Sequence, residues 1–458
     1  MPPAAETVAP ADAVLDAALK RWFGFDSFRP GQRAVVDDAM AGRDLLAIMP
    51  TGGGKSLCFQ LPALLRPGVM VVVSPLIALM QDQVRLLRDM GVNAAFLNSS
   101  LSAREASETS AALLRGDCKL LYLAPERLLM ADFLGGFLPR LQDAQGLSGF
   151  TIDEAHCVSE WGHDFRPEYR QMHQLREHFP DVPVFAFTAT ATGRVRQDIV
   201  HQLGLVEPSV HVSSFNRPNL HYAVSAKDGR TYNEVLDRAR KRPKDSGIVY
   251  CLSRKRVDEL AASLIDDGIR ALPYHAGLGA ETRRANQDAF IRDDAQVIVA
   301  TIAFGMGINK PDVRFVIHAD LPKNVEGYYQ ETGRAGRDGL AAEAWMTYGM
   351  ADVVLLRQMV DGSEAGEERK RLERQKLAKL GRQDGLDMLR LACEQEANAA
   401  EEGDGIGCAR CGRGGSGVFP RRPRWRAGFG GPAFPGGGGC GWGRLYPLVF
   451  ILHPDQNF

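Results

Sequence analysis

Short apolar segments recur along the chain from Asp44 to about Tyr348, and stretches with helical patterning separate them. Most positions within each segment are apolar, which is typical of strands buried on both faces of a parallel sheet. The expected strands are 44–50, 69–75, 119–125, 149–153 and 183–190 in a first series, and 247–251, 270–276, 297–301 and 315–320 in a second. Such strand–helix alternation predicts an α/β fold.

The two series are separated by residues 213–222, a linker-like stretch, so we expect two tandem domains with parallel sheets. The expected divisions are 1–20 as a tail and helix start, 21–208 and 209–350 as the two domains, 351–400 as a short helical segment, and 401–458 as a tail rich in Gly, Arg and Pro. That last stretch cannot bury enough apolar surface to fold alone, so we expect it to be disordered. Near the start, one helical stripe should pack on the first domain: Val14, Leu15, Leu19, Trp22 and Phe23.

Composition adds few constraints. The net charge is −1, so a nucleic-acid partner would have to be bound by local basic groups. We find no apolar run of about 18 residues that could span a membrane and no signal-peptide pattern. Cysteines are sparse before residue 390, which predicts a reducing, cytoplasmic setting.

Residues 49–56, MPTGGGKS, follow an expected strand and match the phosphate-loop pattern G-x-x-x-x-G-K-[ST] except at Met49. Glycines allow backbone N–H groups to face phosphate oxygens, and a helix that starts here adds positive potential. We expect Lys55 to bind the β- and γ-phosphates and Ser56 to bind Mg²⁺. The other expected nucleotide-binding residues are Thr51, Gly52, Gly53 and Gly54. The alternative is a flexible glycine turn.

Two further candidate motifs lie at expected strand ends. Asp153 ends strand 149–153 and Glu154 comes directly after it; Asp153 would hold Mg²⁺ and Glu154 would polarise an attacking water. Thr188 and Thr190 end strand 183–190 and could relay changes at the nucleotide to the other domain. For the threonines, ordinary turn chemistry is an equally good interpretation.

The second domain contains Arg334 and Arg337 in the segment QETGRAGR. Two arginines three positions apart, spaced by glycine and alanine, are suited to deliver guanidinium groups to a γ-phosphate. A surface ion-pair cluster is the alternative.

Taken together, these motifs resemble superfamily 2 helicases, and more closely the RecQ family of DNA helicases, over roughly residues 20–380. The resemblance rests on the quoted segments and on FGFDSFRPGQ (23–32), VVVSPLIALMQDQ (71–83), DEAHCVSEWGHDFRPEY (153–169), ATIAFGMGINKPDVR (300–314) and YYQETGRAGRDG (328–339). In this superfamily the first loop position is often not glycine, so Met49 is compatible with a phosphate loop. The implied fold is two tandem RecA-like domains.

The resemblance also implies roles for individual residues. Phe25, Arg29 and Gln32 match the adenine-recognition motif, and Gln330 and His156 would bridge the ATP site to the DNA track. The aromatic-rich loop that couples DNA binding to hydrolysis would act through Trp161, His163, Phe165 and Arg166. Aromatic rings can stack on unpaired bases without sequence preference, although a lone tryptophan is more often a core residue. Arg337 is our first choice as arginine finger and Arg334 the second.

The resemblance weakens after residue 380. Residues 373–377, ERQKL, match the start of the family's zinc module, but its cysteine cluster and winged helix are not recognisable. Cys408 and Cys411 form one C-x-x-C and are candidate Zn²⁺ ligands, although the next cysteine, Cys440, lies 29 positions further on. We expect this tail to result from a truncation or a frameshift.

The implied function is an ATP-dependent 3′–5′ DNA helicase of repair and recombination. Single-stranded and forked DNA would be its substrates, with single-strand-binding protein as a candidate partner and a location at the bacterial nucleoid. The alternatives are a DNA-stimulated ATPase or translocase with little unwinding, an inactive DNA-binding fragment, and an RNA helicase, which the segment WGHDFRPEY disfavours.

Overall fold

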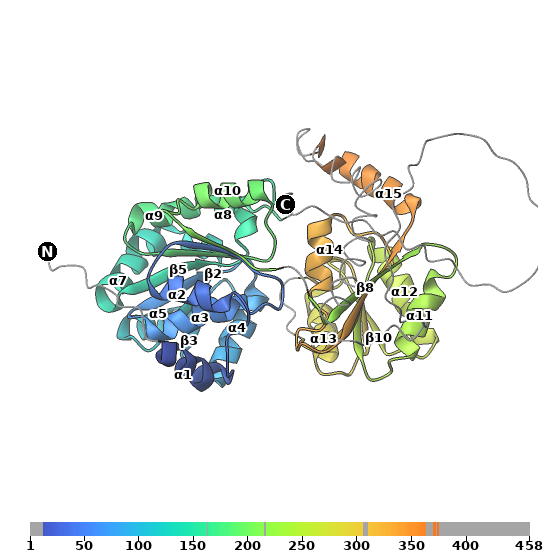
Figure 1. Cartoon of the computed structure of the whole chain (residues 1–458), viewed down its shortest axis with the longest axis horizontal. Coiled ribbons are helices and arrows are strands. Elements are labelled where there is room, and N and C mark those ends of the chain that lie inside the picture. Colours follow the sequence, from blue (N-terminus) through green and yellow to red (C-terminus); the bar gives the residue numbers. More distant parts are fainter. Residues whose placement is uncertain are drawn as a thin grey trace, which may run out of the picture. The chain divides into compact units, whose positions relative to one another are not determined.

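The computed structural model describes residues 12–162, 164–214, 217–305, 310–362, 370–371 and 373–374. Two separate parallel sheets account for the strands within these residues (Figure 1). Several expected features lie outside the described residues: His163, Cys408, Cys411, the tail 401–458 and most of the helical segment expected at 351–400.

The first sheet has seven strands in the order β3-β4-β2-β5-β6-β1-β7, and all of its pairings are parallel. Its strands are β1 (Leu45–Ile48), β2 (Val69–Val73), β3 (Ala94–Leu97), β4 (Leu120–Leu123), β5 (Leu147–Ile152), β6 (Val184–Thr188) and β7 (Ser209–Val212). One face is covered by α1 (Asp12–Phe23), α2 (Gln32–Met40), α3 (Lys55–Leu65) and α4 (Ile77–Asp89). The other face is covered by α5 (Ala103–Arg115), α6 (Pro125–Leu128), α7 (Leu138–Gln145), α8 (Pro167–Arg170), α9 (Gln174–His178) and α10 (Gly193–Gln202).

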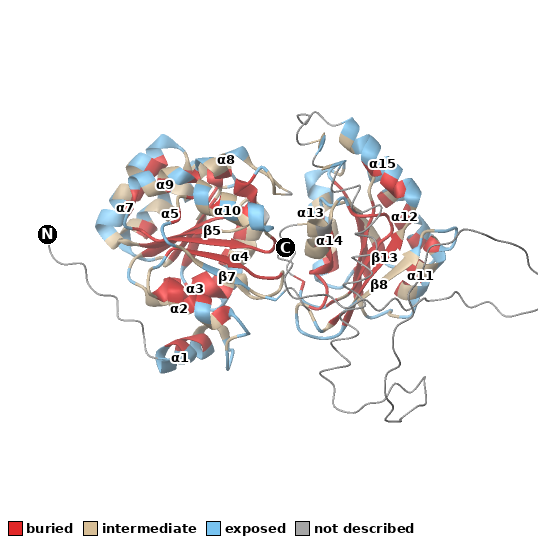
Figure 2. Cartoon of the chain, turned by 45° about the horizontal axis from the view of Figure 1, so that its top comes forward, coloured by how far each residue is buried: buried red, intermediate tan, exposed pale blue. Residues whose placement is uncertain are grey.

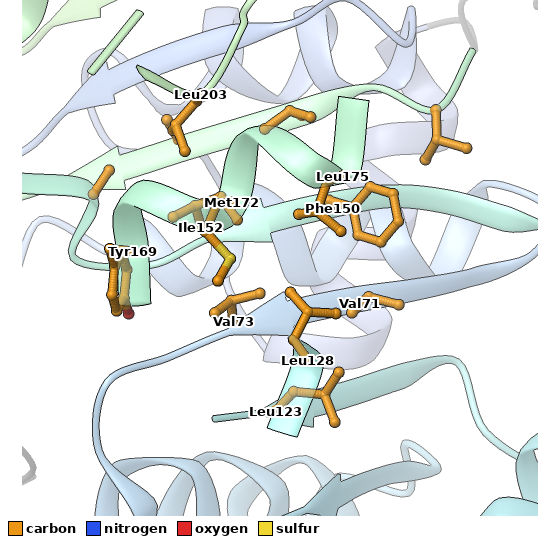
Figure 3. Packing of buried hydrophobic residues seen from close by; sticks show 14 of the residues in the cluster. Val71, Val73, Leu123, Leu128, Phe150, Ile152, Tyr169, Met172, Leu175 and Leu203 are labelled. Carbon is orange, nitrogen blue, oxygen red and sulfur yellow. The ribbon is translucent and has the colours of Figure 1, made fainter. Parts of the chain in front are cut away.

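Alternate residues of each central strand enter different cores, which explains why the strands are apolar throughout. In β2, Val71 and Val73 pack against the helices of the second group, whereas Met70 and Val72 pack against those of the first. Figure 3 shows Val71 and Val73 in the core beneath α5 to α10, together with Phe150 and other labelled residues. The expectation of strands buried on both faces is confirmed.

The second sheet has six strands in the order β10-β11-β9-β12-β13-β8, again with parallel pairings. Its strands are β8 (Leu220–Ala226), β9 (Ser246–Tyr250), β10 (Ala271–Tyr274), β11 (Val297–Ala300), β12 (Val313–His318) and β13 (Ala342–Tyr348). Its helices are α11 (Thr231–Arg240), α12 (Arg254–Asp266), α13 (Ala280–Ile291), α14 (Val325–Thr332) and α15 (Met350–Asp361). The burial colours of Figure 2 show the strands mainly as buried and the outer helix surfaces as exposed.

Every expected strand is present, but the sequence did not predict β3, β7, β8 or β13. β7 pairs with β1, so the first sheet extends to Val212, beyond the division expected at 208/209. In α1, Leu15 and Leu19 are buried as expected, whereas Val14 is 49% exposed and Ala18 is buried instead. Within the described residues, no helix is both long enough and apolar enough to cross a membrane.

Candidate active site

The candidate phosphate loop joins the end of β1 to the start of α3, which begins at Lys55. Gly52 and Gly54 have φ angles of 79° and 81°, in the left-handed region that favours glycine. A Cβ atom on Gly54 would lie only 2.2 Å from Nε2 of Gln32. The glycines therefore serve both the turn and the close approach of a neighbouring side chain.

Met49, the departure from the phosphate-loop pattern, is a core residue. Its side chain is 1% exposed, and its sulfur lies 3.9 Å from the sulfur of Cys58 on α3. A side chain fits at the first loop position because it points into the core beneath α3, so Met49 does not obstruct the loop.

Arg29 and Gln32 brace the loop from the N-terminal segment. Nε2 of Gln32 donates to the carbonyls of Gly53 and Gly54 at 3.2 and 3.3 Å, and its Oε1 accepts from the Arg29 N–H at 2.8 Å. A guanidinium nitrogen of Arg29 donates to the carbonyl of Gly52. Two of the three residues expected at the adenine thus lie beside the loop, and the buried Gln32 amide is hydrogen-bonded to the loop backbone.

Asp153 and Glu154 follow the end of β5, and Glu154 has a φ of 50°, which is uncommon for a residue with a side chain. Burial and the neighbouring Glu154 carboxylate raise the pKa of Asp153 to about 7, while Lys55 acts in the opposite direction. A bound cation would favour the ionised form of such a carboxyl. The Ser56 hydroxyl and the Asp153 carboxyl are hard oxygen donors, which suits Mg²⁺.

The described residues contain no group of three or more His, Cys, Asp or Glu side chains that could hold a metal ion. Mg²⁺ needs no such group, since it is usually held by one or two protein oxygens together with substrate phosphates and water. The residues Ser56 and Asp153 fit that mode of binding.

Glu154 is connected to β6 through His156. The Nδ1 atom of His156 lies 3.3 Å from Oε2 of Glu154 and 2.9 Å from Oγ1 of Thr188. That hydroxyl donates to the Thr190 carbonyl at 3.1 Å, and both His156 and Thr188 are fully buried. The expected coupling residues after β5 and β6 therefore form one chain of contacts that starts at Glu154.

Arg334 and Arg337 lie in the turn that follows α14, and Arg334 is only 6% exposed. Burial, together with the nearby Arg334 and Arg217 guanidinium groups, lowers the pKa of Arg337. Arginine stays charged in proteins, so this environment means that positive charge is concentrated here. An anionic phosphate group would relieve that repulsion.

These motifs line one pocket of about 500 Å³, a size typical of small-molecule sites. Its walls include Phe25, Arg29, Gln32, Thr51, Gly52, Gly54, Lys55, Ser56, Asp153, Glu154, Gln330, Arg334 and Arg337. A cavity of about 600 Å³ elsewhere has a mainly apolar lining and contains none of the expected site residues. The pocket with the convergent charged groups is therefore the candidate active site.

In the aromatic-rich loop, Trp161 is half-buried and packs against the core formed with α5 to α10. The guanidinium carbon of Arg194, at the start of α10, lies 3.2 Å from the Trp161 ring centroid. This cation–π contact covers the ring, so a base could stack there only after Arg194 moves away.

The other described residues of this loop also have partners. Arg166 donates to the carbonyl of Pro75 at 2.9 Å and pairs with Asp164 at 3.2 Å. The Phe165 ring lies 5.7 Å from the guanidinium carbon of Arg170. The loop is thus held within the first domain, close to Glu154 in sequence.

The residues of the site that were not predicted from the sequence include two glutamines and an arginine. Gln60 and Gln83 line the pocket and are hydrogen-bonded to each other at 2.9 Å. Arg217, from the expected linker, donates to the carbonyl of Thr51 at 2.9 Å. A single polar residue in a helix or a linker carries no local pattern that marks it, so tertiary contacts were needed to find these three.

Comparison with known proteins identifies the chain's relatives. Residues 29–199 match the DEAD/DEAH box helicase family, and residues 230–339 match the helicase conserved C-terminal domain. The chain is 48% identical over 338 residues to the ATP-dependent DNA helicase RecQ of Pasteurella multocida, covering 74% of this chain. The chain is therefore similar to RecQ-family helicases over about three quarters of its length.

Similarity to RecQ-family members extends to eukaryotes. The RecQ-like DNA helicase BLM of Xenopus laevis is 46% identical over 349 residues, which cover 75% of this chain. The matched part spans 52% of the length of the Pasteurella relative and 26% of the Xenopus relative.

Solved structures share the fold at low identity. The helicase MrfA bound to DNA aligns with a TM-score of 0.60 at 19% identity, covering 78% of this chain and 54% of MrfA. Saccharomyces cerevisiae Dbp5 bound to RNA and ADP BeF3 aligns with a TM-score of 0.57 at 17% identity, covering 79% of this chain and 97% of Dbp5. These similarities establish the fold of two tandem RecA-like domains, as the sequence predicted.

Proposed function

We propose that this chain is an ATP-dependent DNA helicase, which couples ATP hydrolysis to 3′–5′ movement on single-stranded DNA and to duplex unwinding in repair and recombination. The observation that carries the proposal is the single pocket that contains Lys55, Asp153, Glu154 and the arginine pair. The choice of DNA over RNA is supported by RecQ relatives whose names specify DNA helicases, and the polarity is carried over from the family.

The phosphate loop would bind the triphosphate through backbone N–H groups and the Lys55 ammonium group. Ser56 and Asp153 would hold Mg²⁺, which, when bound, neutralises charge on the phosphates. Phe25, at the pocket wall and 50% exposed, is placed for contact with the base.

Hydrolysis would use residues from both domains. Glu154 would accept a hydrogen bond from the attacking water and orient it, while Arg337, with Arg334 beside it, would stabilise negative charge that develops on the γ-phosphate. Because these groups belong to different domains, binding and release of the nucleotide would change how the two domains engage each other.

Coupling to DNA would run through the contacts of Glu154 with His156 and Thr188 and through the neighbouring aromatic-rich loop. A base that stacks on Trp161 must displace Arg194, a contact worth about 0.5–1 kcal/mol at an exposed site. Stacking itself is worth about 1–3 kcal/mol per base, so the exchange is favourable. Gln330, which lines the pocket, would contribute from the second domain.

A DNA-stimulated ATPase or translocase with little unwinding is the second candidate. It is favoured by the sequence after residue 380, in which the cysteine cluster of the family's zinc module and the winged helix are not recognisable. An inactive DNA-binding fragment would show neither activity.

Three finer expectations are also proposals: Zn²⁺ binding by Cys408 and Cys411, single-strand-binding protein as a partner, and a cytoplasmic location at the nucleoid. Metal analysis of the purified chain tests the first, since a stoichiometric zinc content is expected if the two cysteines bind it. Co-sedimentation with single-strand-binding protein and microscopy of a tagged chain test the other two.

Unwinding of a forked duplex, measured beside DNA-stimulated ATPase on one preparation, tests the proposed function. A helicase gives both activities, and a translocase gives ATPase without strand separation. A Lys55→Ala variant should lose both. If its hydrolysis equals that of the wild type, the observed ATPase does not come from this pocket.

A further inference from the structure

Arg217 lies between β7 and β8 and makes hydrogen bonds in two directions. Nη1 donates to the carbonyls of Thr51 at 2.9 Å and Gly333 at 3.5 Å. Nη2 donates to the carbonyls of Ala335 at 3.0 Å and Gly336 at 2.7 Å. The acceptors of these four bonds are neutral backbone groups, so this guanidinium links segments of backbone.

The two segments that it links are both parts of the candidate active site. Thr51 belongs to the phosphate loop, and residues 333–336 form the turn that presents Arg334 and Arg337. The two segments touch, because a Cβ atom on Gly333 would lie 2.9 Å from the Thr51 Cβ. A Cβ on Gly52 would lie 3.3 Å from both Arg217 Nη1 and Arg337 Cγ.

Asn219 holds the same turn from the linker. Its Nδ2 donates to the carbonyls of Gly336 at 2.8 Å and Leu340 at 2.9 Å, and its Oδ1 accepts from Nε of Arg217 at 3.3 Å. Gly336 has a φ of 58°, and a Cβ there would lie 2.5 Å from Nδ2 of Asn219. The turn therefore approaches the linker so closely at Gly336 that a side chain there would collide with the Asn219 amide, and both linker side chains bind the Gly336 carbonyl.

We propose that Arg217 is a positioning residue of the ATPase, which holds the turn of Arg334 and Arg337 against the phosphate loop so that Arg337 reaches the γ-phosphate. This inference rests on the proposed function. It assigns to the linker a part in catalysis, because the linker would fix the second-domain turn relative to the nucleotide loop.

The guanidinium group is specifically suited to this role. Its donors spread in a rigid plane, which allows one group to bind the loop on one side and the turn on the other. An ammonium group is a compact point charge and could not reach both sets of carbonyls. Arg217→Lys should therefore behave like Arg217→Gln, although it keeps the charge.

The test is steady-state ATPase of the full chain at saturating single-stranded DNA. We expect Arg217→Gln and Arg217→Lys to lower kcat by about 100-fold, the loss typical when a reacting group is misplaced by about 1 Å, with little change in the KM for ATP. The matched control is Arg270→Gln, because Arg270 also donates to backbone carbonyls, those of Asp293 and Asp294, at 2.7 and 3.1 Å. The control should keep wild-type kcat, and thermal melting should show all variants folded.

A double-mutant cycle with Arg337→Gln separates positioning from an independent effect. If Arg217 acts through Arg337, the double variant loses no more kcat than Arg337→Gln alone. Losses that multiply would overturn the inference, as would wild-type kcat in Arg217→Lys or an effect on KM alone. A wild-type chain without ATPase would overturn the proposed function and this inference together, whereas an active wild type with unaffected Arg217 variants overturns only the inference.

Discussion

Substitution of Gln32 by alanine should weaken binding of the triphosphate itself, and not only recognition of the base. The Gln32 amide donates to the carbonyls of Gly53 and Gly54 at 3.2 and 3.3 Å, and its oxygen accepts from the Arg29 N–H. Gln32→Ala removes these bonds from a buried site and leaves the loop free to adopt conformations that do not bind phosphate.

The size of the effect follows from the bonds that are lost. Two bonds to the loop, at about 0.5–1.5 kcal/mol each, stabilise its binding-competent form by about 1–3 kcal/mol. Since about 1.4 kcal/mol corresponds to a tenfold change in affinity, Gln32→Ala should raise the Kd by about 5- to 150-fold. The increase in Kd is smaller the more often the loop without Gln32 still adopts its binding-competent form.

Calorimetric titration with Mg-ATP and with Mg-tripolyphosphate, which has no base, is the decisive assay. Gln32→Ala should weaken both ligands by a similar factor. The control is Phe25→Ala, which removes an exposed aromatic ring at the pocket wall and should weaken ATP alone. If Gln32→Ala weakened ATP but left tripolyphosphate affinity unchanged, the bracing role would be refuted and Gln32 would act on the base.

Three further predictions concern the same site. Glu154→Gln should lower kcat by about 10²- to 10⁴-fold, the range for loss of a catalytic base, and should leave ATP binding intact in a fluorescent-nucleotide assay. Gly54→Ala should weaken nucleotide binding as strongly as Gln32→Ala, because the new Cβ would displace the Gln32 amide, and wild-type affinity would contradict the geometry. Trp161→Ala should retain basal ATPase but lose its stimulation by single-stranded DNA, and a preserved stimulation ratio would remove Trp161 from the coupling role.

The sequence predicted those parts of the fold that a local pattern encodes. Segments such as Val69–Val73 are apolar throughout because both of their faces are buried, and this identified the central strands. The edge strand β3 begins with two alanines, a residue type that is depleted in strands, and the residues of the edge strand β7 alternate between half-buried and exposed, so neither shows the fully apolar pattern. β8 was mistaken in part for linker because only its first residue is fully buried.

The candidate site was predicted as separate motifs, and the structure shows that they meet in one pocket. The sequence could not show that the Gln32 amide is occupied by loop carbonyls, or that Arg194 covers Trp161. It also gave no signal for Arg217, whose contacts are with backbone atoms more than 100 positions away in the chain. Such contacts depend on tertiary placement and leave no spacing pattern in the sequence.

The central claim is that this pocket hydrolyses ATP in response to DNA. The most direct test is the ATPase rate of the purified chain with and without single-stranded DNA, with Lys55→Ala as the inactive control. We predict a strong rise in the wild-type rate on addition of DNA and no hydrolysis by Lys55→Ala. Equal wild-type rates with and without DNA would contradict the assignment of this chain as a DNA-driven motor.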